Sequence, residues 1–340
     1  MHAVSSRCPF LGPVSAQYTP CSPSQLQHPS KVSLTEGTGL IQHSHLVSRP
    51  SWLQARTKQA SAVACFAGES FSCLEKQLEM PEIKVHFKNP DTHHGLTGIL
   101  LEAQGNKSNN VVILCHGLAS SKESPLISFL AKGLSEQGLT TLRFDFAGNG
   151  ESEGAFEFGN YLQEVVDLRA AVQYVRDDLH MKPVAIVGHS KGGDDVLLYA
   201  SQYDDVPLVV NVAGRFNMQR GIRERFGEEV MDKVAKQGQL QMTIRTDRGQ
   251  VVKWYLTQKS IDDRMALNME AAVRKISLSE VLTVHGTKDT TILVEDAESF
   301  SKCIRNHVIC LVEGANHNFS QPAHAQAALT KISTWIQQGL

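Results

Sequence analysis

The stretch that most constrains the fold of this chain is PVAIVGHSKGG, residues 183–193. PVAIV is a short run of apolar, mostly β-branched residues of the kind that fills a parallel sheet, and the residues after it can continue as a helix. Ser190 lies at the apex of the turn between them. In so sharp a turn the side chains two residues before and two after the serine would collide, and Gly188 and Gly192 remove that clash because glycine lacks a Cβ. The pattern predicts a serine presented at the carboxyl end of a central strand.

Composition limits the other options. The chain has 340 residues and a net charge of −2, so it has ample length for a sizeable core and no sign of a polyanion-binding surface. Its longest apolar runs, such as Val111–Cys115, are much shorter than the roughly 20 residues that cross a bilayer. No CxxC, HExxH or comparable ligand spacing occurs, and Cys115 and Cys310 lie inside apolar strand-like runs. We therefore expect no metal site, no nucleic-acid partner and no transmembrane segment.

The first 75 residues differ in composition from the rest. Met1–Gly68 contains one acidic residue, Glu36, and is rich in serine, threonine and proline. Such a composition is typical of organelle transit peptides, whereas a secretory signal would need a compact apolar region. Ser61–Gly68 is similar to a chloroplast processing site, so we expect residues 1–75 to be a removable or disordered transit peptide, cleaved near Cys65, and the mature protein to lie in the chloroplast stroma. Mitochondrial import and a cytoplasmic protein with a disordered tail are the alternatives.

From residue 80 to residue 340, strand-like and helix-like segments alternate, which is typical of one α/β domain. We expect about eight strands in a mostly parallel sheet with helices on both faces, the first two strands pairing antiparallel across a turn-rich segment. The predicted strands are 82–89, 96–103, 111–117, 140–146, 183–189, 207–214, 281–286 and 307–314. The predicted helices are 125–137, 159–179, 191–203, 294–305 and 321–338.

Residues 215–275 interrupt this alternation after the sixth core strand. The segment is rich in charged residues, contains helical runs and lacks buried strands. With about 60 residues it is too long for a simple connection between two sheet strands, so we interpret it as an inserted cap. A cap that leaves the carboxyl edge of the sheet lies over the site, and we expect Phe216 and Met218 to line a substrate slot there. Four arginines accompany them: Arg215, Arg220, Arg223 and Arg225. The other interpretation is a basic helix face that packs on the core through the same apolar residues.

A serine hydroxyl is a weak nucleophile at neutral pH and needs a base that a third group orients. Both partners should follow sheet strands, at the carboxyl edge where Ser190 also lies. Asp289 comes shortly after the strand 281–286, and His317 comes shortly after the strand 307–314. We expect His317 to accept the Ser190 proton while donating its other N–H to Asp289.

Other candidates for the base and the acid are less well placed. Asp296 should already lie in the helix that follows Asp289. His189 is next to Ser190 but should point away from the turn, and His285 ends a strand with no carboxylate in a suitable register. We interpret both histidines as core or rim residues.

An oxyanion that develops during acyl transfer needs two preorganised backbone donors. We expect these to be the N–H groups of Lys191, directly after the serine, and of Leu118, just past His116 and Gly117 in the loop after a buried strand. The Lys191 side chain is expected to face solvent.

These motifs together resemble the α/β-hydrolase superfamily, in the branch of serine-aminopeptidase-like hydrolases, monoacylglycerol lipases and cinnamoyl or feruloyl esterases. The resemblance covers about Glu82–Leu340 and rests on GHSKGG as the nucleophile elbow, on HGTKD and GANH, and on the D-x-x-G-x-G-x-S run at Asp145–Ser152. The chain order Ser190, Asp289, His317 is also that of the superfamily. The resemblance implies hydrolysis of a small acyl ester without a cofactor, in a plant-type protein with a plastid transit peptide.

Three departures from the family pattern bear on the substrate. Lys191 stands where the cinnamoyl esterases commonly have glutamine, Asp194 and Asp195 make the start of the helix unusually acidic, and TTIL follows Asp289 where a proline-bearing segment is common. The function expected is a serine hydrolase that cleaves a small carboxylic ester, as an esterase, an acylglycerol lipase or a feruloyl-esterase-like enzyme, through an acyl-enzyme on Ser190. The alternatives are a ligand receptor or binding module of the same fold with little turnover, and a serine aminopeptidase, which the lack of an acidic cluster for a substrate amine in residues 215–275 disfavours.

Overall fold

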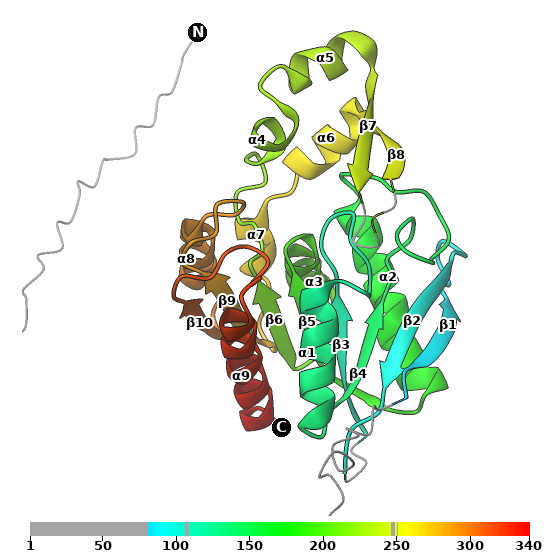
Figure 1. Cartoon of the computed structure of the whole chain (residues 1–340), viewed down its shortest axis with the longest axis vertical. Helices are drawn as coiled ribbons and strands as arrows, with labels where there is room; N and C mark the ends of the chain where they lie inside the picture. The colour runs from blue at the N-terminus through cyan, green and yellow to red at the C-terminus, as the bar shows by residue number, and fades with distance from the viewer. Residues whose placement is uncertain (1–80, 106–108, 246–248, 250) are drawn as a thin grey trace, which may run out of the picture. The chain divides into compact units, whose positions relative to one another are not determined.

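One eight-stranded sheet forms the centre of the described part of the chain (Figure 1). The computed structural model describes residues 81–105, 109–245, 249 and 251–340, and the expected transit peptide lies outside these ranges. The strands of this sheet are β1 (Ile83–Lys88), β2 (Gly95–Leu101), β3 (Asn110–Cys115), β4 (Thr140–Phe144), β5 (Lys182–His189), β6 (Leu208–Val212), β9 (Glu280–Gly286) and β10 (His307–Val312). Their order in space is β1-β2-β4-β3-β5-β6-β9-β10.

The sheet is mostly parallel. β2 runs antiparallel to its neighbours β1 and β4, and the other neighbouring pairs are parallel. The four middle strands, β3 to β6, are buried along almost their whole length. Because both of their faces are covered, they appear in the sequence as continuous apolar runs rather than alternating ones. The predicted fold class, strand number and antiparallel first pair are confirmed.

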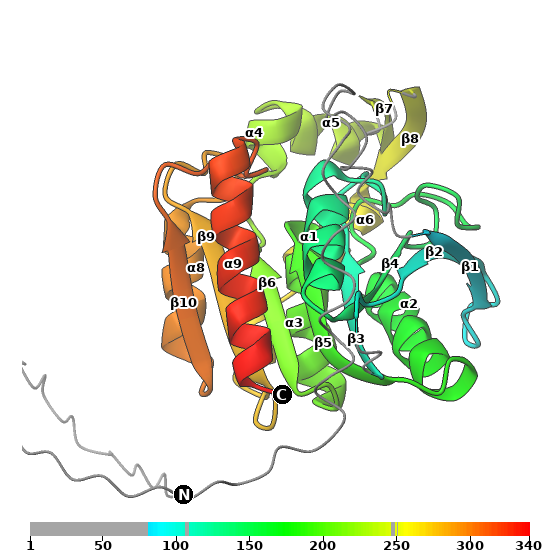
Figure 2. The same cartoon turned by 60° about the horizontal axis from the view of Figure 1, so that its bottom comes forward.

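Helices cover both faces of the sheet (Figures 1 and 2). One apolar cluster lies between the sheet and two helices, α1 and α9, and a second lies between the opposite face and α2, α3, α7 and α8. The bounds are α1 (Pro125–Glu136), α2 (Tyr161–Gln173), α3 (Lys191–Tyr203), α7 (Met269–Val273), α8 (Val294–Cys303) and α9 (Pro322–Gln338). The predicted helix 159–179 differs at its end, where Tyr174–Asp178 forms a π-helical turn that places the Tyr174 ring in a stack on Phe87, with 4.8 Å between centroids.

The cap between β6 and β9 has a small core of its own. It contains α4 (Ile222–Phe226), α5 (Val230–Gln237), β7 (Gln239–Arg245), β8 (Val251–Thr257) and α6 (Gln258–Met265), which lie above the carboxyl edge of the sheet in Figure 1. Its apolar centre includes Val234, Trp254, Leu256 and Ile261 together with Phe158 from the loop before α2.

The β7–β8 hairpin was not predicted, because neither of its strands is a continuous apolar run. β7 has only a half-buried face, at Leu240, Met242 and Ile244, and its alternating burial is the pattern of a strand covered on one side. The end of the predicted cap is also different. α7 lies within the range 215–275, but its Met269 packs in the apolar cluster between the sheet and α2, α3 and α8 rather than in the cap.

Two carboxylates of the main domain bind the chain where it enters the cap and where it leaves the cap. Asp296 Oδ1 accepts the backbone N–H groups of Phe216 and Asn217, at 2.7 and 2.8 Å. Asp204 accepts the backbone N–H groups of three consecutive residues, 277–279, each at 2.8 Å. Both ends of the insertion are therefore attached to the domain that carries the sheet.

The run Asp145–Ser152 ties together the loops after β3 and β4. The Asp145 carboxylate accepts the backbone N–H of Lys122 at 2.7 Å and binds the Lys122 ammonium at 2.5 Å, and both side chains are fully buried. Ser152 Oγ donates to the Asp145 carbonyl at 2.6 Å. A Cβ on Gly150 would lie 2.2 Å from the Asp145 carboxylate, which explains the glycine at that position.

Within the described residues, no helix combines the length and the apolar character that crossing a membrane requires.

The turn between β5 and α3 is as sharp as its sequence predicts. Ser190 has φ of 56° and ψ of −117°, a backbone conformation that a residue with a side chain rarely adopts. A Cβ on Gly188 would lie 1.9 Å from the Gly192 carbonyl oxygen, and one on Gly192 would lie 2.5 Å from the His116 carbonyl oxygen. At both glycines, two segments of backbone therefore lie too close together for any side chain to fit between them.

Replacing Gly188 by alanine should lower the free energy of unfolding by about 3 kcal/mol, because the new methyl group meets backbone that cannot move away. Urea unfolding midpoints measure the loss. Gly238→Ala is the matched control: its φ is 77° but no atom lies within 4 Å of the new Cβ, so only a backbone penalty of about 1 kcal/mol is expected there. Equal losses in the two variants would contradict the steric explanation.

Candidate active site

Ser190, His317 and Asp289 form a continuous chain of hydrogen bonds at the carboxyl edge of the sheet. His317 Nε2 lies 2.9 Å from Ser190 Oγ, and His317 Nδ1 lies 2.7 Å from Asp289 Oδ2. The serine follows β5, the aspartate follows β9 and the histidine follows β10, so three neighbouring or near-neighbouring strands bring them together. Such an arrangement can pass the serine proton to the imidazole and stabilise the imidazolium that results.

The Asp289 carboxylate is held ionised by its surroundings. Burial alone raises its pKa, but hydrogen bonds from His285 and His317 and from the backbone N–H of Ile292 outweigh burial, and the pKa falls well below its usual range. Oδ1 accepts the N–H groups of Thr291 and Ile292 at 2.8 and 2.9 Å, which leaves Oδ2 for the histidine. Asp289 is therefore fixed in position by backbone and charged in the folded state.

His285 and His189, the other two candidate bases, contact Asp289 and His317 instead of Ser190. His285 Nε2 lies 2.9 Å from the Ile292 carbonyl and 3.4 Å from Asp289 Oδ2, so the prediction that no carboxylate lies in its register is wrong. His189 Nε2 lies 2.9 Å from the His317 carbonyl and donates to it. Burial, followed by the neighbouring His317, lowers the pKa of His189 to about 4, so this ring is neutral at physiological pH.

Two backbone N–H groups on the wall of the cavity that Ser190 lines are available to a ligand. Within the described residues, neither Leu118 N–H nor Lys191 N–H donates a backbone hydrogen bond, and both residues line the same cavity as Ser190. The loop after β3 approaches Ser190 closely at Gly117, where an added Cβ would lie 3.2 Å from the Ser190 Cβ. His116 fixes that loop: its Nε2 accepts the Phe146 N–H at 3.1 Å, so its Nδ1 carries the proton and donates to the Gly117 carbonyl at 2.8 Å.

The Lys191 side chain does not face solvent, contrary to prediction. It is 4% exposed, and its ammonium lies 2.6 Å from Glu164 Oε1, 2.8 Å from Asn160 Oδ1 and 4.6 Å from the centre of the Tyr161 ring. A lysine at the first turn of a helix places its charge near the positive end of the helix dipole, and the buried Glu164 carboxylate compensates for it. This ion pair holds α2 against the start of α3.

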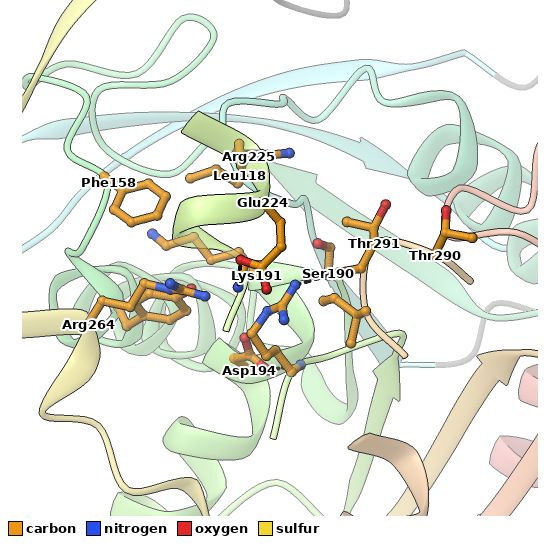
Figure 3. Close-up of a pocket in the computed structure, with 14 residues that line it drawn as sticks. Leu118, Phe158, Ser190, Lys191, Asp194, Glu224, Arg225, Arg264, Thr290 and Thr291 are labelled. Carbon is orange, nitrogen blue, oxygen red and sulfur yellow. Dashed lines mark hydrogen bonds between the residues drawn. The ribbon is translucent and has the colours of Figure 1, made fainter. Parts of the chain in front are cut away.

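A cavity of about 270 Å³ opens beside Ser190 (Figure 3). Its apolar wall consists of Leu118, Phe158, Tyr161 and Ile292. Charged residues make up much of the rest: Lys191, Asp194, Arg215, Glu224, Arg225 and Arg264. Most ligand pockets are lined mainly by apolar side chains, so this one is unusually rich in charge.

Phe216 and Met218 do not line this cavity. Met218 is 2% exposed and belongs to the apolar cluster between the sheet and α2, α3, α7 and α8. Phe216 packs against the same cluster, and its ring makes an edge-to-face contact with that of Phe300, with 5.1 Å between the centroids. The Asp296 carboxylate, which accepts the backbone N–H groups of residues 216 and 217, holds this part of the chain against α8. Their assignment as substrate-binding residues therefore has no support in the geometry.

Arg264, Tyr161 and Phe158 line the cavity and were not predicted as site residues. Arg264 lies on a helix that reads as solvated and charged, and the other two lie around the start of α2. Only the loop between β4 and α2 carries a signal, since it follows a central strand at the same edge as Ser190.

Comparison with known proteins gives a consistent picture. A family model described as serine aminopeptidase, S33, matches residues 106–321. Among curated proteins, YfhR of Salmonella typhimurium is 28% identical over 204 residues, which is 58% of this chain and 60% of that protein. The chain aligns with less than two thirds of the length of the curated relatives that it matches.

Two solved structures share the fold. The α/β hydrolase GrgF from Penicillium sp. sh18 superposes with a TM-score of 0.64 at 18% identity, covering 76% of this chain and 99% of its own. Est1E from Butyrivibrio proteoclasticus, with ferulic acid bound, superposes with a TM-score of 0.59 at 20% identity, covering 75% of this chain and 98% of its own. At such identities the likeness concerns the fold alone.

The lowered pKa of His189 predicts a stability that depends on pH. An unfolded histidine has a pKa of about 6.5, and the folded one has a pKa of about 4. The unfolded chain therefore binds more protons in this window, so stability rises with pH there and is lost as pH falls. We expect this residue alone to cost about 2 kcal/mol of stability between pH 7 and pH 5.

Urea unfolding of wild type and His189→Gln across that range measures the effect. Glutamine keeps an N–H donor for the His317 carbonyl but does not titrate, so its profile should be flatter by that amount. His307, whose pKa burial also lowers to about 4, contributes equally to both proteins and cancels in the difference. Identical slopes would show that His189 does not titrate differently in the two states.

Proposed function

We propose that this chain, which belongs to the S33 serine aminopeptidase family of hydrolases, is a serine esterase that cleaves a small carboxylic ester through an acyl-enzyme on Ser190. The observation that carries the proposal is the hydrogen-bonded series from Ser190 Oγ to His317 and on to Asp289, at 2.9 and 2.7 Å. The serine at its end lines a cavity, where an ester can reach it.

The reaction takes two steps. In the first, His317 Nε2 removes the Ser190 hydroxyl proton while Oγ attacks the ester carbonyl, and the same proton then passes from His317 to the departing alcohol. The acyl group remains on Oγ. In the second, His317 removes a proton from water, the hydroxide attacks the acyl carbonyl, and the carboxylic acid leaves as the proton returns to Oγ. Asp289 orients the imidazole and stabilises its positive charge in both steps. The reaction needs no cofactor.

Backbone N–H groups of Leu118 and Lys191 are proposed to bind the oxyanion in each step. Their support is their position on the cavity wall beside Ser190 and the two contacts that fix them. The His116 hydrogen bonds hold the loop before Leu118, and the Glu164 ion pair holds the start of α3.

An ester is favoured over a peptide with a free amino terminus by the charge of the cavity. Four of its lining residues are basic and two are acidic, and Glu224 already accepts the Gly221 N–H at 2.9 Å. A substrate ammonium group would meet mainly like charge there. The activity implied by the family's description is thus less well supported than ester hydrolysis.

Ser190→Ala should lower kcat for a neutral ester such as 4-nitrophenyl butyrate by about 10³-fold or more, since the triad acts as one unit. A fluorophosphonate should label wild type but not the variant. Ser201→Ala, which removes a hydroxyl from α3 well along the helix, is the control and should behave as wild type. Retained turnover in Ser190→Ala would end the proposal, whereas labelling of wild type without turnover of any ester would favour a binding module.

For the N-terminal region, we propose plastid import directed by residues 1–75, supported by the single acidic residue of Met1–Gly68 and by the richness of that stretch in serine and threonine. A fluorescent protein fused after residue 75 should accumulate in chloroplasts of transfected plant cells, and the shortened chain 76–340 should keep full esterase activity. A mitochondrial or cytoplasmic reporter would contradict the destination and leave the esterase proposal untouched.

A further inference from the structure

The cavity beside Ser190 carries an excess of guanidinium groups, and this excess bears on the kind of ester it takes. Arg215, Arg225 and Arg264 line it from the cap, and we call them the guanidinium cluster. Arg215 is 8% exposed and Arg264 is 3% exposed, so two of the three charges are largely removed from water. Buried charges are costly unless they are paired and hydrogen-bonded.

Arg264 is only partly satisfied within the protein. Its Nη2 donates to the Arg220 carbonyl at 2.6 Å, its guanidinium lies 5.3 Å from the centre of the Phe158 ring, and it also interacts with the Tyr161 hydroxyl. Its Nη1 is buried and has no hydrogen-bond partner among the described residues. A guanidinium donor that is buried on a cavity wall without a partner calls for an acceptor from a ligand.

Arg215 adds a second charge of the same sign. Its Nη2 donates to the neutral Thr291 carbonyl at 2.7 Å, and its favourable charge interactions are with Asp194 and Asp296. Burial, followed by repulsion from Arg264, lowers the pKa of Arg215. Both guanidinium groups line the same cavity, so an anion bound there would reduce the repulsion between them.

The acidic residues on the cavity wall do not cancel this excess. Burial raises the pKa of Asp194 well above its usual range, and its Oδ1 accepts the Arg215 backbone N–H at 2.6 Å. Glu224 is ionised, but its Oε2 binds the Gly221 N–H at the start of α4. The Lys191 ammonium already pairs with Glu164 outside the cavity wall. At most two carboxylates thus face three guanidinium groups.

We propose that the substrate is a small ester that bears a carboxylate, and that the guanidinium cluster binds this carboxylate while Ser190 attacks the ester carbonyl. Arg264 Nη1 supplies the buried donor, and planar guanidinium groups suit a carboxylate because two N–H groups can meet its two oxygens. The cavity of about 270 Å³ restricts the ligand to a small molecule. This inference rests on the proposed esterase function and deepens it by naming the substrate class.

The carboxylate can belong to the acyl part or to the alcohol part of the ester, and two matched pairs of substrates separate these cases. For the acyl part, mono-4-nitrophenyl adipate is compared with its neutral methyl ester, methyl 4-nitrophenyl adipate. For the alcohol part, 4-(butyryloxy)benzoate is compared with its methyl ester. Wild type should prefer the anionic member of one pair by about tenfold or more in kcat/KM, as charge-assisted hydrogen bonds are among the stronger contacts. No preference in either pair would overturn the inference.

Arg264→Met tests the buried donor, since methionine preserves much of the side-chain volume without its charge. In the preferred pair, the ratio of the anionic to the neutral kcat/KM should fall about tenfold or more. The control is Arg223→Met, an exposed arginine of α4 that does not line the cavity and whose Nη1 donates to the Glu228 carbonyl; it should keep the wild-type ratio. An unchanged ratio in folded Arg264→Met would also overturn the inference.

If Arg264→Met does not fold, Arg225→Met provides the same comparison from the exposed side of the cluster, and an unchanged ratio there counts against the inference in the same way. Fluorophosphonate labelling and turnover of the neutral esters keep the two proposals apart. Labelling and neutral turnover without a charge preference would leave the esterase standing and remove the inference. Absence of both would remove the esterase, and calorimetric titration with adipate, compared with dimethyl adipate, would then decide whether the cavity binds a carboxylate at all.

Discussion

The backbone at Ser190 is the constraint on which the rest of the structure depends. A residue with a side chain at φ of 56° and ψ of −117° stores roughly 1–3 kcal/mol of strain, which persists only when its neighbours determine it fully. Here the Ser190 N–H donates to the Val212 carbonyl of β6 at 2.8 Å, and Gly192 passes against the end of β3. Three strands and one helix thus converge on one residue. Any shift of β3, β5 or β6 would change the direction of the serine hydroxyl.

The parts of the fold that the sequence predicts well are those where one residue type is the only solution. Gly188 and Gly192 are required by backbone contacts, and the middle strands read as apolar runs because both faces are covered. The positions of Ser190, Asp289 and His317 follow from strand order alone, since the carboxyl ends of parallel strands meet at one edge. The structure brings those three together at hydrogen-bond distances, and their catalytic roles stay a prediction.

The parts that could not be predicted depend on which neighbour a side chain meets. Lys191 looks like a solvated lysine until Glu164, 27 residues earlier in the chain, is placed beside it. Phe216 and Arg264 have the same local sequence signals whether they face the core, the cavity or solvent, because both lie in segments of mixed charge. The half-buried β7 was missed for a related reason, since one covered face gives a weaker signal than two.

The attachment of the cap at both of its ends has a consequence for how proteins of this design can diversify. Asp296 and Asp204, both in the sheet domain, hold the chain at residues 216–217 and 277–279, and α7 contributes to the main core. Between α7 and the first anchor, α4, α5, α6 and the β7–β8 hairpin share a separate apolar cluster, to which Phe158 of the sheet domain also belongs. Substitutions, insertions and deletions within the cap can therefore be accommodated while both junctions stay in place. Substrate selectivity can then change during evolution without disturbing the strands that carry Ser190, Asp289 and His317.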